Sequence, residues 1–299
     1  MFFTFISCAL NRQKNKPAFV SSSLLRRFVA SALKEDRGDG DHTSLATISP
    51  TLKGRSRLLV KEKGIIAGVD LARSIFHFID PRLKVRVFIY DGKKVRKGDV
   101  VFHVEGSARS ILLAERLVLN CMQRMSGIAT KTDHLRRLCK GTSVQLLDTR
   151  KTTPNFRFAE KWAVCIGGGQ NHRYGLFDMI LIKDNHIDLC GGIRESLRSA
   201  KKYIKERRKS LKIEIEARSF GEVKQILEEG GVHRILLDNM SIPRIKKAVK
   251  LIDGKAETEA SGGINAKNVR AYAKAGVDYI SIGELTHQLK SLDLSLKAF

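Results

Sequence analysis

The sequence is short of acidic residues, of paired cysteines and of long apolar runs, and each shortage excludes a class of protein. Its 31 acidic residues stand against 55 basic ones among 299, which gives a formal net charge of +24. The five cysteines are an odd number and form no Cys-x-x-Cys pair, which argues against a disulfide framework and against a structural zinc site. No stretch is long and apolar enough for a transmembrane helix, so we expect no membrane span.

The N-terminal residues combine a short apolar run, "MFFTFISCAL", with a basic stretch, "NRQKNK", that follows it. A secretory signal peptide carries its positive charge before the apolar run, so the order here is reversed. No acidic residue precedes Glu35, which leaves an organelle-targeting segment open. We interpret residues 1–22 as a variable tail, and we expect a cytoplasmic protein because its cysteine usage suits a reducing compartment.

The surplus of positive charge attracts anions, which include nucleic acid, acidic membrane and anionic substrates. A solvated basic surface is an equally good interpretation. The run "KKYIKERRKSLK" at residues 201–212 holds seven basic residues and one acidic residue, and we interpret it as a solvated helix face. A basic nucleic-acid-binding protein is one hypothesis, but no nucleic-acid-binding motif accompanies the charge, so we expect no specific nucleic acid partner.

The first part of the chain mixes helices with short strands. Apolar residues at helical spacing predict helices at residues 23–36, 69–79 and 107–127, and Ser107 is placed to cap the third. Glycine-punctuated segments between them predict strands and hairpins. One face of the third helix carries three polar residues at four-residue spacing, which alone predicts a solvated stripe: Arg116, Asn120 and Arg124.

The second half alternates short β-prone segments with helical stretches, which predicts a parallel sheet with crossover helices. Four strand ends follow one another at steps of 22, 23 and 22 residues: Glu216, Asp238, Ser261 and Gly283. Six such strands, or seven with "AVCIGG" at residues 163–168, favour a β/α barrel. An open doubly wound sheet is the alternative, and both architectures place their chemistry at the carboxyl ends of the strands.

The predicted strand ends gather charged and small residues on one rim: Arg150, Lys151, Lys183, Glu216, Asp238, Ser261, Gly262, Gly263 and Gly283. Charges buried there without partners would be costly, so the rim is either ion-paired internally or built around a charged ligand. "ASGGI" followed by "NAKNVRAYAKAG" predicts a small-residue turn and a helix start, which suit a phosphate. "SIGELTH" predicts a second such turn.

Two groups of side chains divide the rim. Glu216 and Asp238 lie one strand apart and could bind ribose hydroxyls, hold Mg²⁺ or act as acid and base. Five potential cations converge elsewhere, and the two arginines among them can bind carboxylates with two hydrogen bonds each: Arg150, Lys151, His172, Arg173 and Lys183. A lone histidine is more often structural, but His172 follows the triple glycine of "GGGQNHR", so we interpret it as part of an anion site.

Several long blocks resemble one enzyme family: "ERLVLNCMQRMSGIAT", "LLDTRKTTPNFRFAEKWAVCIGGGQNHRYGLFDMILIKDNHI", "ILLDNM", "EASGGI" and "SIGELTH". The chain is similar to quinolinate phosphoribosyltransferase, also called nicotinate-nucleotide pyrophosphorylase (carboxylating), from about residue 24 to residue 293. The asparagine and phenylalanine after the proline of "TTPNF" depart from the family's usual pattern.

The resemblance implies an N-terminal α/β sandwich domain at residues 23–128, with residues 288–299 packing on it, and a C-terminal irregular seven-stranded α/β barrel at residues 129–287. It implies at least a homodimer. The implied reaction joins quinolinate to phosphoribosyl pyrophosphate with decarboxylation, gives nicotinate mononucleotide in NAD biosynthesis, and needs Mg²⁺. The alternative is a transferase of the same fold that acts on another small acid.

The resemblance also implies roles for individual residues. Quinolinate would be bound by five side chains, of which the first comes from the partner subunit: Arg116, Arg150, His172, Arg173 and Lys183. Phosphoribosyl pyrophosphate would be held by nine residues: Lys151, Glu216, Asp238, Ser261, Gly262, Gly263, Gly283, Glu284 and His287. The catalytic residues among them would be Lys151, Glu216 and Asp238, with Mg²⁺ held by the two carboxylates and the substrate pyrophosphate.

Overall fold

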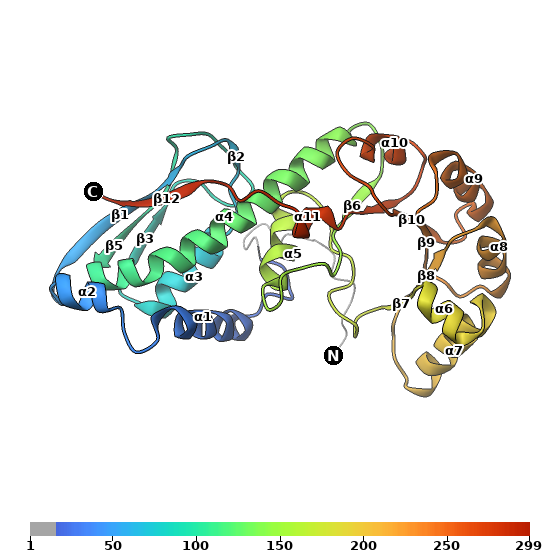
Figure 1. Ribbon diagram of the computed structural model, residues 1–299, viewed down its shortest axis with the longest axis horizontal. Coiled ribbons are helices and arrows are strands. Elements are labelled where there is room, and N and C mark those ends of the chain that lie inside the picture. The colour runs from blue at the N-terminus through green and yellow to red at the C-terminus, as the bar shows by residue number, and fades with distance from the viewer. Residues whose placement is uncertain (1–15) are drawn as a thin grey trace. The chain divides into compact units, whose positions relative to one another are not determined.

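The computed structural model describes residues 16–299, so residues 1–15 of the predicted tail lie outside the described residues (Figure 1). The chain forms two compact units. The barrel unit consists of His134–Lys151 and Gly169–Glu284, and the sheet unit of the described residues up to Asp133 with Thr152–Gly168 and Leu285–Phe299. The proposed division of the chain at residues 128 and 129 stays a prediction.

Six parallel strands form the sheet of the barrel unit, in the order β6-β11-β10-β9-β8-β7. Their bounds are β6 Gln145–Leu147, β7 Ile180–Ile182, β8 Ile213–Ala217, β9 Arg234–Asp238, β10 Glu257–Ser261 and β11 Tyr279–Ser281. From β7 to β11 the order follows the chain, and β6 joins at the end. A doubly wound sheet reverses its order at a switch point, so the barrel prediction is confirmed.

The seventh segment of the barrel is a single bridge rather than a strand. Gln170 pairs in parallel with Leu147 on the free edge of β6. The predicted strand "AVCIGG" is wrong, because Ala163–Ile166 ends helix α5 (Arg157–Ile166) and Gly167 caps it. The described residues contain no regular ladder between Gln170 and β7, which agrees with an irregular barrel.

Five helices connect the barrel strands: α6 Asp184–Cys190, α7 Ile193–Glu206, α8 Phe220–Glu229, α9 Ile242–Ile252 and α10 Val269–Ala273. Their apolar faces cover the outward side chains of the strands, such as Ile215 and Leu237, which are fully buried. Part of the basic run at residues 201–212 lies on α7, where Lys201 forms an ion pair with Glu229 of α8.

An antiparallel sheet in the order β12-β1-β5-β3 organises the other unit. Its strands are β1 Lys53–Val60, β3 Lys84–Val87, β5 Val100–Ser107 and β12 Leu294–Ala298, and a small ladder joins β2 Gly64–Ile65 to β4 Lys94–Val95. Figure 1 shows the C-terminal strand β12 running along β1. Residues from both ends of the chain therefore share one sheet.

The helices of the sheet unit are α1 Ser22–Arg37, α2 His42–Thr47, α3 Val69–Ile79 and α5. Two more helices cross its boundary: α4 Ala108–Leu138, whose residues from His134 on belong to the barrel unit, and the short α11 Glu284–His287. The three helices predicted from apolar spacing are confirmed, although α4 continues past its predicted end. The Ser107 hydroxyl accepts a hydrogen bond from the Ser110 amide at 3.3 Å, as expected of an N-cap. No helix within residues 16–299 is long and apolar enough to cross a membrane.

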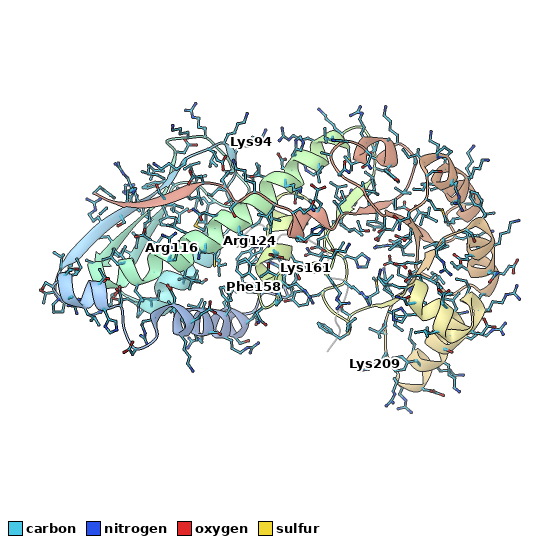
Figure 2. The ribbon with its side chains drawn as sticks, in the orientation of Figure 1. Lys94, Arg116, Arg124, Phe158, Lys161 and Lys209 are labelled. Carbon is cyan, nitrogen blue, oxygen red and sulfur yellow. The ribbon has the colours of Figure 1, made fainter. Side chains whose placement is uncertain are left out.

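A buried ion pair attaches α5 to α4 inside the sheet unit. Arg124, labelled on α4 in Figure 2, donates from Nε to the fully buried Glu160 at 2.6 Å. The other Glu160 oxygen accepts from the Thr153 amide. The predicted solvated stripe is therefore correct for Arg116 and Asn120, which are exposed, and wrong for Arg124.

Helix α3 is capped by a residue distant in sequence. Its N-cap position is Gly68, which has no side chain, and the carboxylate of Asp91 accepts the Val69 amide at 2.9 Å instead. Burial raises the pKa of Asp91 to about 7, although the Val69 hydrogen bond opposes that shift. The folded protein thus keeps a proton on Asp91 that the unfolded chain releases near pH 4.

We expect Asp91→Asn to flatten the pH dependence of stability. The contribution of Asp91 to stability is full below pH 4 and is lost as the pH rises to about 7. The free energy of unfolding of the wild type should therefore fall more steeply between pH 5 and 8 than that of the variant. The difference between the two falls should be on the order of 2 kcal/mol. Urea unfolding followed by the fluorescence of Trp162, the single tryptophan and a buried residue of the same unit, measures this. Exposed Asp36→Asn is the control, and equal slopes for Asp91→Asn and wild type would contradict the prediction.

Candidate active site

The barrel strands carry polar and charged residues on their inward face. On β8 these are Glu214 and Glu216, on β9 Arg234 and Asp238 with Leu236 between them, and on β10 Glu257, Glu259 and Ser261. Successive side chains of a strand point to opposite faces, so residues two apart lie on the same face. The register places Asp238 beside Ser261 at the carboxyl ends, and Arg234 beside Glu214 and Glu257 near the other ends.

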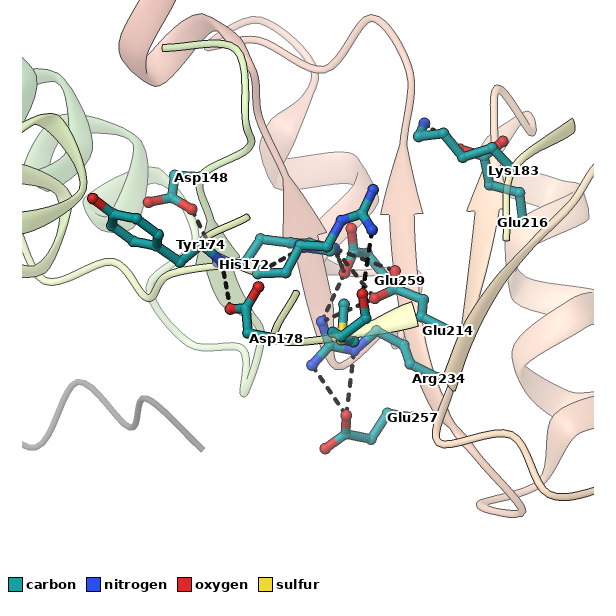
Figure 3. A network of polar contacts seen from close by, with 12 residues as sticks. Asp148, His172, Tyr174, Asp178, Lys183, Glu214, Glu216, Arg234, Glu257 and Glu259 are labelled. Atoms are coloured by element: carbon teal, nitrogen blue, oxygen red, sulfur yellow. Dashed lines mark hydrogen bonds and ion pairs between the residues drawn. The ribbon is translucent and has the colours of Figure 1, made fainter. Parts of the chain in front are cut away.

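An arginine compensates the acids inside the barrel. Arg234 Nη1 lies 2.9 Å from Glu259 and 3.8 Å from Glu214, and Nη2 lies 3.0 Å from Glu257. Its guanidinium also stacks over the Tyr279 ring, 3.9 Å from the centroid. Figure 3 shows Arg234 among the three glutamates. An unpaired carboxylate buried here would cost several kcal/mol, so Arg234 is needed for the interior to form.

The two deepest carboxyls affect one another. Glu214 and Glu259 are fully buried. Burial raises the pKa of Glu214 to about 7 against the attraction of Arg234, and burial together with the charge of Glu214 raises the pKa of Glu259 to about 7. Adjacent carboxyls in a dry site do not both ionise readily, so the pair retains a proton near neutral pH.

His172 joins this cluster from the loop after α5. Its Nε2 lies 3.2 Å from Glu214 and 3.6 Å from Glu259. These three side chains could together hold a cation, because their donor atoms lie within 4.8 Å of one another. Arg234 already supplies the positive charge at 2.9 Å, so the arrangement is that of an ion-paired cluster rather than a metal site.

Asp148 fixes the loop that carries His172. One Asp148 oxygen accepts the His172 amide at 2.9 Å and the other accepts the Asn171 side chain at 2.5 Å. Just before the loop, a Cβ on Gly167 would lie 2.6 Å from the Ala129 carbonyl, and Gly168 has φ +86°. The first two glycines of "GGGQNHR" therefore serve close packing and a turn.

Two arginines lie close enough at the rim to repel one another. Arg173 is half-buried, and its Nη1 donates to the Met179 carbonyl at 3.3 Å. Burial, followed by the charge of nearby Arg150, lowers the pKa of Arg173. Glu214 and Glu216 partly oppose that shift. Negative charge near Arg173 therefore favours its charged form, as Glu214 and Glu216 already do.

Lys183 and Glu216 bind each other across neighbouring strand ends. Lys183 Nζ lies 2.6 Å from one Glu216 oxygen, and the Asp184 amide donates to the other at 3.0 Å. The Lys183 side chain is 48% exposed while that of Glu216 is 6% exposed, so solvent or a ligand reaches the lysine more readily. The two halves of the rim that the sequence separates are thus joined by an ion pair.

The Ser-Gly-Gly turn follows β10 as predicted, and its first glycine is required. Gly262 has φ +101°, and a Cβ there would lie 2.1 Å from the Asn239 side chain. The Asn239 side-chain amide also donates to Asp238 at 2.6 Å, and its backbone amide donates to the Ser261 carbonyl at 2.9 Å. The helix predicted within residues 265–276 after this turn is confirmed, although α10 begins only at Val269.

The remaining predicted residues lie as follows. Lys151 is exposed after β6, and Gly283 and Glu284 follow β11, where α11 begins. His287, at the end of α11, and Arg116, on α4, belong to the sheet unit and are exposed. The structure therefore places His172 and Arg173 on one loop and Lys183 against Glu216, and the charge of Arg150 acts on Arg173. The roles of all predicted site residues stay predictions.

A parallel barrel with clustered cations, carboxylates and a glycine turn on its rim defines an α/β-barrel enzyme that acts on anionic substrates. Two family models match the chain: the N-terminal domain of quinolinate phosphoribosyl transferase over residues 41–126, and its C-terminal domain over residues 128–297. The chain belongs to the quinolinate phosphoribosyltransferase family, and as such it is a pentosyltransferase.

Individual relatives agree with this assignment. The mitochondrial quinolinate phosphoribosyltransferase [decarboxylating] 2a of Nicotiana tabacum is 46% identical over 281 residues, 89% of this chain and 80% of that protein. The chloroplastic nicotinate-nucleotide pyrophosphorylase [carboxylating] of Arabidopsis thaliana is 46% identical over 91% of this chain and 82% of its own. The crystal structure of NadC from Streptococcus pyogenes superposes with a TM-score of 0.88 at 35% identity, over 93% of this chain and 97% of that one.

Sequence reasoning overlooked the acids beneath the rim and the aspartate that holds the loop. It considered strand ends, and so it selected Glu216 and Asp238 but not Glu214, Glu259 or Asp148. The alternation in "IEIEA" and "ETEAS" carries the missing signal, since a glutamate two residues before a rim residue shares its inward face.

We expect Arg234→Met to destabilise the protein by about 3–5 kcal/mol, because it leaves Glu214 and Glu259 buried without their cation. Adding Glu259→Met should recover part of that loss. Urea unfolding followed by circular dichroism measures both variants. Arg194→Met, which removes an exposed ion pair with Glu228, is the control and should change stability by less than about 1 kcal/mol. A similar small change for Arg234→Met would show that the cluster does not need this arginine.

Proposed function

We propose that the protein transfers the phosphoribosyl group of phosphoribosyl pyrophosphate to quinolinate with decarboxylation, giving nicotinate mononucleotide, pyrophosphate and CO₂. The observation that carries the proposal is the set of cations that the barrel places at its rim: Arg173, whose pKa is lowered by burial and by the charge of Arg150, and Lys183, which forms an ion pair with Glu216 between neighbouring strand ends. Quinolinate has two adjacent carboxylates and is a compact anion of the kind such a cluster favours. The names of the relatives support this substrate.

The acid substrate would be bound by Arg150, His172, Arg173 and Lys183. The arginines suit carboxylates because each presents a planar fork of donors, whereas Lys183 adds a point charge. Since Lys183 holds Glu216 in this structure, a substrate carboxylate that takes Lys183 would release Glu216. Binding of the acid substrate at Lys183 would thereby affect Glu216, which would face the phosphoribosyl donor.

The phosphoribosyl donor would lie over the other part of the rim. Glu216 and Asp238 would face the ribose. Ser261, Gly262 and Gly263 would line the phosphate. The turn at Gly283 and Glu284, together with His287, would complete the phosphate-binding part of the site. The backbone of a glycine turn allows close approach of phosphate oxygens. Lys151, exposed after β6, would stabilise the leaving pyrophosphate.

Mg²⁺ would be held by Glu216, Asp238 and the substrate pyrophosphate. The residues fit such an ion, because Mg²⁺ prefers carboxylate and phosphate oxygens and usually takes few protein ligands. The ion would neutralise charge on the leaving pyrophosphate. The protein's own carboxylates would favour the positive charge that develops on the ribose ring, and no covalent nucleophile is required.

Decarboxylation would follow ribosylation of the pyridine nitrogen, which turns the ring into an electron sink. The cations at the rim would then mainly keep the ring in position. A same-fold transferase for another acid is less well supported, because Arg150, His172, Arg173 and Lys183 are all present. The cytoplasmic location stays a prediction, and the printed names of two plant relatives give mitochondrial and chloroplastic locations for those proteins.

We expect the purified protein to release CO₂ from quinolinate in the presence of phosphoribosyl pyrophosphate and Mg²⁺, and to leave nicotinate unchanged. Activity should be lost when EDTA removes the metal and should return when Mg²⁺ is added. Product chromatography together with labelled CO₂ release measures both reactions. Turnover of nicotinate without turnover of quinolinate would overturn the proposed function.

We also propose that the enzyme is at least a homodimer in which Arg116 reaches the partner's site. Arg116 is exposed on α4, so it is available to a second subunit. Mixing the inactive variants Arg116→Ala and Asp238→Ala should restore up to about a quarter of the activity, because a mixed dimer has one site with neither substitution. Subunit exchange is verified by mass spectrometry, and no recovery after exchange would exclude a shared site.

A further inference from the structure

The contacts of the His172 ring define its protonation. Nδ1 accepts a hydrogen bond from the Arg173 amide at 2.8 Å, and an amide N–H requires a lone pair on that nitrogen. Nε2 faces the carboxyls of Glu214 and Glu259 at 3.2 and 3.6 Å and therefore carries the hydrogen. The ring is thus the neutral Nε2–H form, with both nitrogens in contacts within the protein.

The same contacts connect the barrel interior to the rim. Glu214 lies 3.2 Å from Nε2 on one side of the ring, with Glu259 3.6 Å from the same nitrogen, and Nδ1 on the other side accepts the backbone amide of Arg173. The His172 side chain is only 6% exposed, so it is well shielded from solvent. Figure 3 shows His172 lying between Asp148 and the glutamates.

We propose that Glu214 and Glu259 are positioning residues for the acid substrate, which act through His172 to set the place of Arg173. They select the Nε2–H form of the ring, which leaves Nδ1 to accept the Arg173 amide. His172 then contributes orientation rather than charge to the site. Burying two carboxyls costs free energy of folding. The placement of Arg173 for substrate binding is the functional gain that offsets this cost.

This inference rests on the proposed function for its kinetic test. Glu259→Gln keeps the shape of the side chain but offers an amide in place of a carboxylate oxygen. We expect it to raise the KM for quinolinate about tenfold, while the KM for phosphoribosyl pyrophosphate stays within about twofold. Glu214→Gln should act in the same direction.

Glu257→Gln is the matched control. Glu257 lies on the same strand and contacts the same arginine at 3.0 Å, but it has no contact with His172 in the described residues 16–299. It should leave the KM for quinolinate within about twofold of the wild-type value. Equal effects of Glu257→Gln and Glu259→Gln would show that the acids act through Arg234 and general stability, which would overturn the inference.

A double-mutant cycle tests the route through Arg173. In an Arg173→Ala background, Glu259→Gln should have little further effect on the KM for quinolinate, because the side chain that it positions is gone. Independent, multiplicative effects would overturn the inference. If wild-type protein does not turn over quinolinate in the same assay, the proposed function fails instead, so the two failures are distinguishable.

A spectroscopic measurement remains if the variants do not fold. Selective ¹⁵N-histidine labelling and long-range ¹H–¹⁵N correlation report the form of each ring, and the signals of His172 are assigned by their loss in His172→Gln. The expected pattern is a protonated Nε2 and an unprotonated Nδ1 near neutral pH. A doubly protonated ring, or a protonated Nδ1, would overturn the inference.

Discussion

The chemistry of this barrel depends on the burial of two carboxyls, Glu214 and Glu259, beneath the rim. Their desolvation is tolerable because Arg234 lies on the strand between theirs. The parallel register pairs Arg234 with Glu214, and its guanidinium reaches Glu259 at 2.9 Å. The position of Arg234 is secured in turn by Tyr279 on one side and by Glu257 on the other. The interior of the barrel is therefore a charged layer, and the His172 loop is attached to it. A barrel filled with aliphatic side chains would offer that loop no polar partner.

The rim above this layer carries cations in different surroundings. Burial and the charge of Arg150 lower the pKa of Arg173, while Glu214, Asp178 and Glu216 oppose that shift, so negative charge near Arg173 stabilises it. Lys183 forms an ion pair with Glu216 at 2.6 Å. Under the proposed function, a substrate carboxylate that binds Lys183 would have to displace Glu216, and this exchange would couple the two parts of the rim.

The sequence predicts the barrel well, because regular strand spacing and the order of the elements follow from local periodicity. It also predicts which residues reach the rim, because strand ends are visible as the last residues of apolar runs. The errors have physical causes. "AVCIGG" is apolar and short, so periodicity does not separate a strand from the buried end of helix α5. The ion pair of Lys183 with Glu216 joins different strands, and the cap of α3 by Asp91 spans 22 residues, so neither leaves a local signal. The inward position of Glu214 could have been predicted, because it lies two residues before Glu216 and therefore on the same face of its strand.

The contacts on both sides of the His172 ring favour its neutral form. Nδ1 accepts the hydrogen bond of the Arg173 amide at 2.8 Å, and Nε2 lies 3.2 Å from Glu214. A ring protonated on both nitrogens would lose the acceptor for the Arg173 amide. A neutral ring therefore preserves the geometry of the loop, and the buried acids below it are the feature that selects this form.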